Sequence, residues 1–338
     1  MSHTHTDASG VVDLTEPTPL GGSRSPWIGF IGRRLMTLVV SLWIIATIVF
    51  FLTRAIGGDS VRASAGLSAT PEYIAARRAE LGLDDPLLEQ YLRFLRQLVT
   101  FDFGESISTG NAVAVEIGAR LPYTVQLGLY AFVFSMLVAV PLGIWMAVLT
   151  ENGRGDRLNA IYNGFSGFFA SIPDFLIAIA LVIVFAVRLR WLPAAGGNGP
   201  EAFILPVLTM SLGLIAVLSR LMKSESTRVL REEYVRTARA NNLAPRVVLF
   251  RHVLPNVMTA TLTYSGMTLA TLMGGAVITE TVFGWPGIGN LMVKAISVYD
   301  YPLIAGIVLI VATFSLVATF IVDVVLARVD PKSLIGSS

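Results

Sequence analysis

Six long apolar runs, separated by polar and charged segments, set the pattern of the sequence. They occupy residues 35–52, 123–149, 158–187, 203–218, 257–278 and 302–326. The hydrocarbon core of a bilayer is about 30 Å thick, so roughly 20 helical residues cross it at about 1.5 Å per residue. The runs therefore predict an all-α, polytopic membrane protein with six transmembrane helices. In the third run, Ser171-Ile172-Pro173-Asp174 interrupts the pattern, and we expect the helix to kink or split there.

Two segments fall outside these runs. Residues 1–26 are rich in Thr, Ser, Gly and Pro and have no periodicity, which predicts a disordered cytoplasmic tail ahead of a membrane domain at 27–338. The tail lacks the basic, apolar and cleavage regions of a signal peptide. Residues 53–122 are predicted to form an extracytoplasmic segment between the first and second spans, with helical patterns at 71–81 and 87–98.

The basic residues of the short loops predict the orientation. Those on one side are Arg154, Arg157, Arg220, Lys223, Arg228, Arg231, Arg236, Arg239, Arg246, Arg251, Arg328 and Lys332. Those in the short loops of the other side are Arg188, Arg190 and Lys294. Because short cytoplasmic loops carry the excess of Lys and Arg, both termini are predicted to lie in the cytoplasm.

The composition agrees with a membrane protein and narrows the chemistry. Apolar residues make up 54% of the chain and charged residues only 14%, the net charge is +2, and there is no Cys and only three His. These values argue against nucleic-acid binding, thiol catalysis and a Cys- or His-rich metal site. The chain also lacks a G-x-x-x-x-G-K-[ST] phosphate loop, a G-x-S-x-G elbow and an H-E-x-x-H helix. We therefore expect no catalytic and no metal site, and any ATP-driven step needs another polypeptide.

Three acidic residues, Asp174, Glu280 and Asp323, are the candidates for a proton relay within the spans. Carriers coupled to protons use buried carboxylates or histidines in this way. All three lie near predicted helix ends or beside the break, so each is predicted to cap a helix or lie at the interface. The spans are thus expected to form a passive pathway.

The basic loop at 223–255 has a more specific pattern. Glu232, Glu233, Arg236 and Arg239 recur at i,i+3 and i,i+4 spacing, as on a solvated helix. Asn242 is predicted to break this helix, Pro245 to begin a second one and Pro255 to close it. Two short helices that meet at a sharp corner form a rigid projection, which transmits force to a soluble partner. The alternative from the residues alone is a charged amphipathic helix on lipid headgroups.

The same loop resembles a known motif. Residues 233–243 read EYVRTARANNL and residues 251–255 read RHVLP. The stretch is similar to the EAA loop of binding-protein-dependent importer permeases, with Arg236-Thr237-Ala238 at the E-A-A positions and Asn242 at the glycine. His252 stands at the isoleucine position of that motif, and Leu254-Pro255 match directly. The Y-V-R-T-A-R-A variant is typical of dipeptide, oligopeptide and nickel permeases.

The resemblance extends over about residues 30–332. Further segments similar to the family's signatures are Ser171-Ile172-Pro173, Trp191-Leu192-Pro193, the run from Glu280 to Gly287, and Asp300-Tyr301-Pro302. Two departures are Asn242 in place of glycine and Gly57-Gly58-Asp59 in place of P-G-D. Asn occupies the same backbone region as Gly at modest cost, so the first departure is mild.

The resemblance implies a fold like that of a type I ABC importer permease, with 27–338 as the permease domain in the bacterial inner membrane. It implies a sister permease that forms a heterodimer with this chain, two ATPase subunits that bind ATP and Mg²⁺, and an extracytoplasmic solute-binding protein. The coupling residues implied by the match are Arg236, Thr237, Ala238, Arg239, Asn242, Leu243, His252, Leu254 and Pro255. The expected solute is a peptide or a similar small molecule.

Two rival hypotheses remain beside the importer permease. One is a stand-alone ion-coupled carrier or channel, which predicts a functional carboxylate within a span. The other is a structural membrane scaffold, which leaves the EAA-type loop without an explanation. The sequence does not identify the solute among dipeptides, longer peptides, peptide-like cofactors and nickel chelates, and it indicates no substrate-binding residues.

Overall fold

The computed structural model describes residues 26–56, 70–80, 82, 84–153, 155–196 and 199–329. Within these ranges every regular element is a helix, and the only β pairing is a single bridge between Glu105 and Ala112. The predicted tail up to residue 25, the Gly57-Gly58-Asp59 turn and Lys332 lie outside the described residues. The all-α prediction is confirmed.

Four helices are long and apolar enough to cross a membrane by themselves. They are α1 (Pro26–Ile56), α5 (Val113–Leu149), α8 (Ile204–Leu230) with its preceding 3-10 turn η3 (Pro200–Phe203), and α13 (Tyr301–Val329). A fifth long helix, α11 (Leu254–Val282), has 29 residues and therefore spans about 44 Å. Its many Thr, Ser and Gly residues make it less apolar than the other four.

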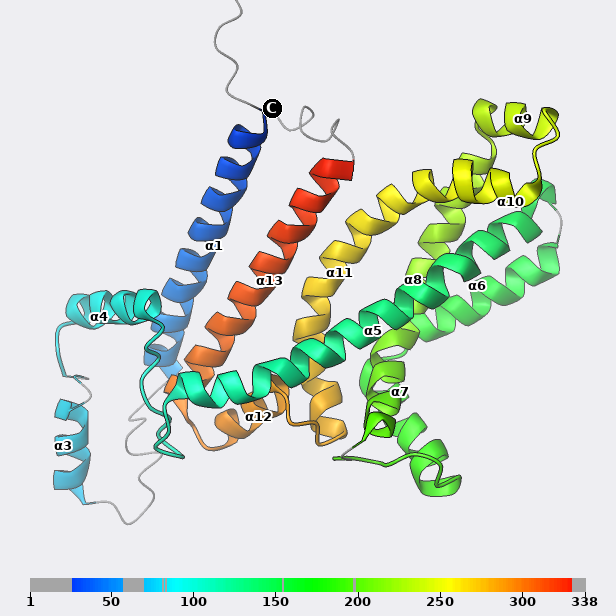
Figure 1. Cartoon of the computed structure of the whole chain (residues 1–338). Coiled ribbons are helices and arrows are strands. Elements are labelled where there is room, and N and C mark those ends of the chain that lie inside the picture. Colours follow the sequence, from blue (N-terminus) through cyan, green and yellow to red (C-terminus); the bar gives the residue numbers. More distant parts are fainter. Residues whose placement is uncertain are drawn as a thin grey trace, which may run out of the picture.

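The remaining crossing is broken. Helix α6 (Asp156–Ser171) is followed by α7 (Asp174–Leu181) and the π-helical turn η2 (Val182–Arg188), and the two halves meet at 98°. Pro173 disfavours a helical conformation at the residue before it, and Ile172 is indeed extended, with φ −79° and ψ 127°. The predicted interruption is confirmed as a split. With this pair counted as one broken span, five crossings pass by length and composition, and α11 is long enough to form a sixth. Figure 1 shows how these helices are arranged.

Two helices are longer than the apolar runs that predicted their spans, because hydropathy indicates the part of a helix that lies in the bilayer and not its full length. Helix α5 begins at Val113, ahead of the apolar run that starts at residue 123. Helix α8 continues to Leu230 and not to 218, which makes the first part of the predicted basic loop a helical extension. No Gly or Pro ends α8 after its apolar run, and Met222 and Val229 on this extension are buried.

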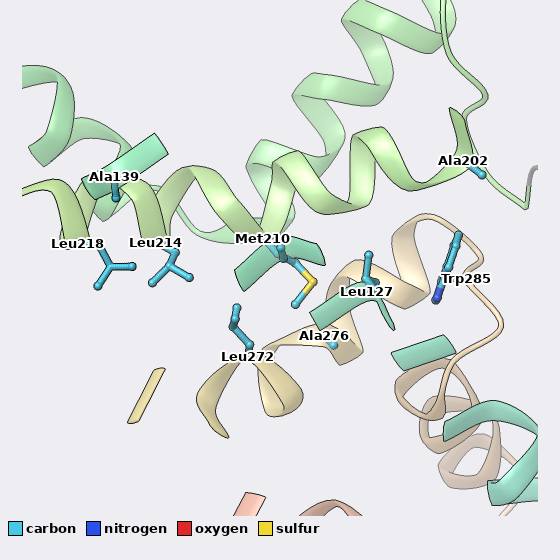
Figure 2. Packing of buried hydrophobic residues seen from close by; sticks show 10 residues of the cluster. Leu127, Ala139, Ala202, Met210, Leu214, Leu218, Leu272, Ala276 and Trp285 are labelled. Atoms are coloured by element: carbon cyan, nitrogen blue, oxygen red, sulfur yellow. The ribbon is translucent and has the colours of Figure 1, made fainter. Parts of the chain in front are cut away.

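The core lies where α5 crosses α8. A Cβ atom on Gly143 of α5 would collide with Met222 and with the backbone of Ser219 on α8, so the close approach of the two helices requires glycine. Farther along, Leu127 of α5, Met210 of α8 and Leu272 of α11 belong to one buried cluster (Figure 2). This cluster holds three of the spans together.

A buried carboxylate holds together the end of this core that lies away from α9 (Glu233–Ala240). Glu280 is fully buried near the end of α11, and it accepts hydrogen bonds from Thr124 Oγ1 (2.6 Å) and from the amide of Asn290 (3.1 Å). The hydroxyl of Thr124 in turn accepts the amide of Ile288 (2.8 Å). Glu280 thereby caps the N-terminus of α12 (Ile288–Ser297), as the capping prediction requires, but it lies in the protein interior. A Cβ on Gly287 would strike its carboxylate.

The segment before α5 carries two short helices, α3 (Pro71–Glu80) and α4 (Leu87–Thr100), which confirm the two helical patterns. Its last part is attached to the start of α13 by Asp300. One carboxylate oxygen of Asp300 accepts the hydroxyls of Ser106 (2.6 Å) and Ser108 (2.7 Å) and the amide of Ser108 (3.0 Å). The other accepts the amide of Leu303 (3.2 Å). Burial raises the pKa of Asp300, but these hydrogen bonds together lower it below its usual value.

We predict that Thr124→Val lowers the free energy of unfolding by about 1–3 kcal/mol, because the buried carboxylate of Glu280 and the amide of Ile288 both lose a partner. The measurement is thermal or denaturant unfolding of the purified protein in detergent. Thr281→Val is the matched control, since its exposed hydroxyl bonds only to the carbonyl of Val277 in its own helix. Equal losses in the two variants would contradict the role of Glu280.

We predict that Asp300→Asn destabilises the protein at neutral pH and much less in acid. The lowered pKa of folded Asp300 makes its carboxylate stabilising above the unfolded pKa of about 3.9, and this contribution is lost as the pH falls through the folded pKa. Unfolding midpoints of wild type and variant should therefore converge as the pH is lowered toward about 4 and below. Asp102→Asn, an exposed change in the same segment, should show no such convergence.

Candidate functional site

The segment that resembles the EAA loop forms a corner between α8 and α11. It contains α9 (Glu233–Ala240), a turn at residues 241–244, α10 (Pro245–Val247) and the π-helical turn η4 (Val248–Val253). We call residues 233–255 the α9–α10 corner. It lies at the end of the molecule where α1 begins and α13 ends, away from α3 and α12 (Figure 1).

The turn after α9 is a Schellman motif centred on Asn242. Asn242 has a positive φ of 55°, and its amide bonds to the carbonyl of Arg239 (3.0 Å). The amide of Leu243 bonds to the carbonyl of Ala238 (3.3 Å). These two bonds satisfy carbonyls that the end of a helix otherwise leaves unpaired, and they require a left-handed residue between them. Asn fills this position because it tolerates that conformation better than most residues except Gly.

One side of the corner is buried against the spans. Val235 and Ala238 of α9 are buried, and they join a cluster with Val248 and Val253 of η4. The same cluster includes Ile144 and Ala147 of α5, Met222 of α8 and Val257 of α11. Ala238 therefore faces inward, where only a small side chain fits between α9 and its neighbours. The corner is attached to three spans at once.

An ion pair also joins α9 to the far end of α5. The guanidinium of Arg239 donates to both carboxylate oxygens of Glu151, at 2.8 and 3.2 Å. Glu151 lies in the 3-10 turn η1 (Glu151–Gly153) that follows α5. A partly exposed pair of this kind adds little stability, but its two parallel bonds set the orientation of α9. The sequence motif contained Arg239, but nothing in it pointed to Glu151.

The opposite side of the corner is open. Leu243, Val247 and Phe250 are exposed, and Phe250 is 64% accessible. Arg236 and Arg246 lie exposed in the same segment. An apolar surface with a basic rim on a rigid support has the composition of a protein-binding site. The motif did not reveal Phe250 or Val247, because their exposure depends on how η4 packs.

The prediction that Pro255 closes the second helix was wrong. Helical structure runs from Pro245 through η4 into α11, and Pro255 lies in the first turn of α11. Because Pro has no amide hydrogen, the helix widens to π geometry just before it instead of ending. The carbonyl of His252 accepts the side-chain amide of Asn256 (2.8 Å). The corner is thus continuous with a membrane-spanning helix.

The predicted coupling residues fall into three groups. Those exposed on α9 and its turn are Arg236, Thr237, Asn242 and Leu243. Ala238 is buried, and Arg239 pairs with Glu151. His252, Leu254 and Pro255 form the junction of η4 with α11, where they shape the continuous helix and do not share the surface of α9.

The other acidic candidates have structural positions. Asp323 of α13 pairs with Arg34 of α1 at 3.2 Å, and Asp174 lies in the first turn of α7. Among the described residues no group of three or more His, Asp or Glu side chains is placed to hold a metal ion. In the part of the chain that the structure describes, the polar and charged side chains considered as candidates therefore lie mainly at helix ends and in the α9–α10 corner.

Comparison with known proteins assigns the family. Residues 139–334 match the binding-protein-dependent transport system inner membrane component, and residues 27–128 match the N-terminal membrane component of such systems. The glutathione transport system permease protein GsiC of Escherichia coli strain K12 is 34% identical over 304 residues, covering 90% of this chain and 98% of that protein. The same protein of Shigella dysenteriae serotype 1 matches equally well. These relatives favour the importer permease over the ion-coupled carrier or channel.

Solved structures support the fold. An inward-facing conformation of the MetNI methionine ABC transporter aligns with a TM-score of 0.56 at 15% identity, covering 64% of this chain and 96% of that chain. A second crystal form of the same transporter gives a TM-score of 0.54, with 63% of this chain covered. Permeases of this family hydrolyse no ATP themselves and work with a partner permease, ATPase subunits and a binding protein. The chain belongs to the family of binding-protein-dependent transport system inner membrane components and is the permease subunit of an ABC importer.

Proposed function

We propose that this chain pairs with a non-identical sister permease and that its α9–α10 corner is seated on one of two cytoplasmic ATPase subunits. The single observation that carries the proposal is the corner itself: it is fixed to α5, α8 and α11 on one side and open on the other. Leu243, Val247 and Phe250 supply the apolar contact, and the neighbouring arginines supply its basic rim.

The position of the corner allows a movement of the ATPase to be transmitted to the membrane spans. It follows α8 after a short turn at residues 231–232 and runs into α11 at its other end, and the Asn242 turn holds the angle within it. When ATP and Mg²⁺ draw the two ATPases together, the seated corner moves and takes the ends of these spans with it. Such a switch requires that the ATPases contact the two states of the permease differently.

The proposed cargo is a small peptide or a peptide-like molecule, delivered by a solute-binding protein on the outer side. The support is the similarity to the glutathione transport system permease protein of Escherichia coli. Isolation of the cognate binding protein, followed by identification of the ligand that co-purifies with it, tests the cargo directly. A ligand with no peptide-like group contradicts this part of the proposal.

The proposed orientation in the bacterial inner membrane places both termini and the corner in the cytoplasm. The support is the excess of Arg and Lys in the loops on that side. Helices α3, α4 and α12 then lie on the extracytoplasmic side, where a binding protein docks.

We predict that Asn242→Val uncouples transport from ATP hydrolysis. A β-branched residue at a φ of 55° is disfavoured by about 1–2 kcal/mol, so the Schellman turn reshapes and α9 tilts. Uptake into proteoliposomes that contain the complete transporter should fall, and the ATPase rate should lose its dependence on the loaded binding protein.

Two matched variants control this experiment. Asn241→Val makes the same chemical change one residue earlier, where φ is −77°, and should transport normally. Asn242→Gly supplies the residue that the motif usually has and should also remain coupled. Normal, ATP-dependent uptake by the Asn242→Val transporter would contradict the coupling role.

We predict opposite labelling of two introduced cysteines. Because the chain has no Cys, each variant carries a single thiol. A membrane-impermeant maleimide should label Glu72→Cys on α3 in intact cells, whereas Arg246→Cys in the corner should react only after the membrane is permeabilised; both positions are exposed. The reverse pattern would invert the proposed orientation.

A further inference from the structure

Helix α4 presents apolar side chains that the rest of the described chain does not cover. Leu88, Leu92, Leu95 and Val99 follow each other at i, i+4, i+7 and i+11, which places them along one stripe of the helix. Leu88 is 68% and Val99 81% accessible. We call these four residues the α4 stripe. Apolar side chains aligned in this way require a partner, because scattered exposed leucines are common but a continuous row is not.

An adjacent face of α4 is already occupied by α1. The hydroxyl of Tyr91 lies 2.8 Å from that of Thr47, and the ring of Phe50 contacts Tyr91 and Phe94 with centroid distances of 5.2 and 5.5 Å. Leu98 joins the same cluster. These contacts hold α4 crosswise on the side of α1 (Figure 1). The stripe therefore stays available beside α1.

The contacts also fix the depth of α4. Thr47 lies about 8 Å inside the outer end of the apolar run at 35–52, at about 1.5 Å per residue. At this contact α4 thus lies alongside the apolar run of α1 and not beyond its end. Interfacial helices bury their apolar side about 5–10 Å into the boundary between headgroups and acyl chains, which is the depth found here.

The polar side of α4 points the other way. Arg93, on the opposite side of the helix from the stripe, forms an ion pair with Asp85 in the connection to α3. In Figure 1, α3 lies beyond α4 on the side away from the cytoplasmic corner. The Arg93–Asp85 ion pair thus lies toward the connection to α3, and the stripe lies on another side of α4.

We propose that α4 is an interfacial helix whose stripe inserts into the acyl chains of the leaflet on the α3 side, the outer leaflet in the proposed orientation. The proposed occupant is lipid because α1, the span against which α4 packs, is strongly apolar and has only a small share of its residues buried in the described chain, which leaves a side of it for lipid. Ile48, Phe51 and Leu52 of α1 are exposed apolar residues, and the ring of Phe51 stacks on Tyr91 with a centroid distance of 6.4 Å. Lipid chains that cover this side of α1 therefore meet the stripe as well.

The consequence is an anchor for the outer segment. Helix α4 precedes the Ser106–Asp300 attachment, so the segment is held at two points, by lipid at one and by hydrogen bonds at the other. Thickness and packing of the outer leaflet then act on the surface to which the binding protein docks.

The test places a fluorescent probe on single cysteines of the full chain, reconstituted with its partners in vesicles of phosphatidylethanolamine and phosphatidylglycerol. A phospholipid with a nitroxide near the glycerol end of its acyl chain quenches probes that touch the acyl region. Leu92→Cys and Val99→Cys report on the stripe, and Glu89→Cys and Thr100→Cys report on the exposed polar side of the same helix. All four positions are solvent-accessible in the described chain, so labelling leaves the core intact.

We expect quenching at Leu92 and Val99 to be several times stronger than at Glu89 and Thr100. Equal quenching on both sides, or none on the stripe, overturns the proposal. Quenching at the stripe is also compared with and without the sister permease and the binding protein. If adding either protein abolishes the quenching, the proposal is overturned, because the stripe is then a protein contact. Ile48→Cys, at an exposed apolar position of α1, is the positive control: quenching of its probe confirms that the nitroxide lipid reaches the chain. The outcome is independent of the maleimide test of orientation, since quenching occurs in either leaflet.

Discussion

A bilayer core offers no hydrogen-bond partner to a backbone amide or carbonyl, and the rest of this structure follows from that constraint. The spans are long helices because helices satisfy their own backbone. Wherever a helix stops, inside or outside the membrane, its end leaves backbone groups that need other partners, as at the 98° break before Asp174, the turn at Asn242 and the turn after Glu280. In the last two, side chains or a left-handed residue replace the missing helical hydrogen bonds.

These hydrogen bonds and turns fix the positions of the helices at both ends of the molecule. On one side Glu280 and Asp300 accept amides at the first turns of α12 and α13 and join segments that are distant in sequence. On the other side the Schellman turn and the Arg239–Glu151 pair set the angle of α9. Between them the spans pack through small residues such as Gly143, where close approach replaces the hydrophobic effect as the source of attraction.

This distribution suits a permease that is moved by another protein. The corner follows α8 after a short turn at residues 231–232, and helical structure runs from it through the π-helical turn η4 into α11. Near the far end of α11, Glu280 links that helix to α5 and α12. In the proposed function, a displacement at the corner passes along α11 toward this link. The chain needs no reactive group of its own to take part in an ATP-driven cycle.

Apolar runs alone predicted the helical class, the long membrane-spanning helices and the break at Pro173, since bilayer thickness and proline stereochemistry act locally. The EAA-like residues likewise predicted a corner at Asn242, because a left-handed turn is a property of a few neighbouring residues. Helical structure extends beyond the predicted spans at Val113 and Leu230 and, against the prediction, continues through Pro255, since packing and not hydropathy decides how far a helix continues. The buried side of Ala238, the pairing of Arg239 with Glu151 and the cap formed by Glu280 join residues far apart in the chain. Only tertiary packing brings such partners together, because nothing in the local sequence encodes which distant group a side chain meets.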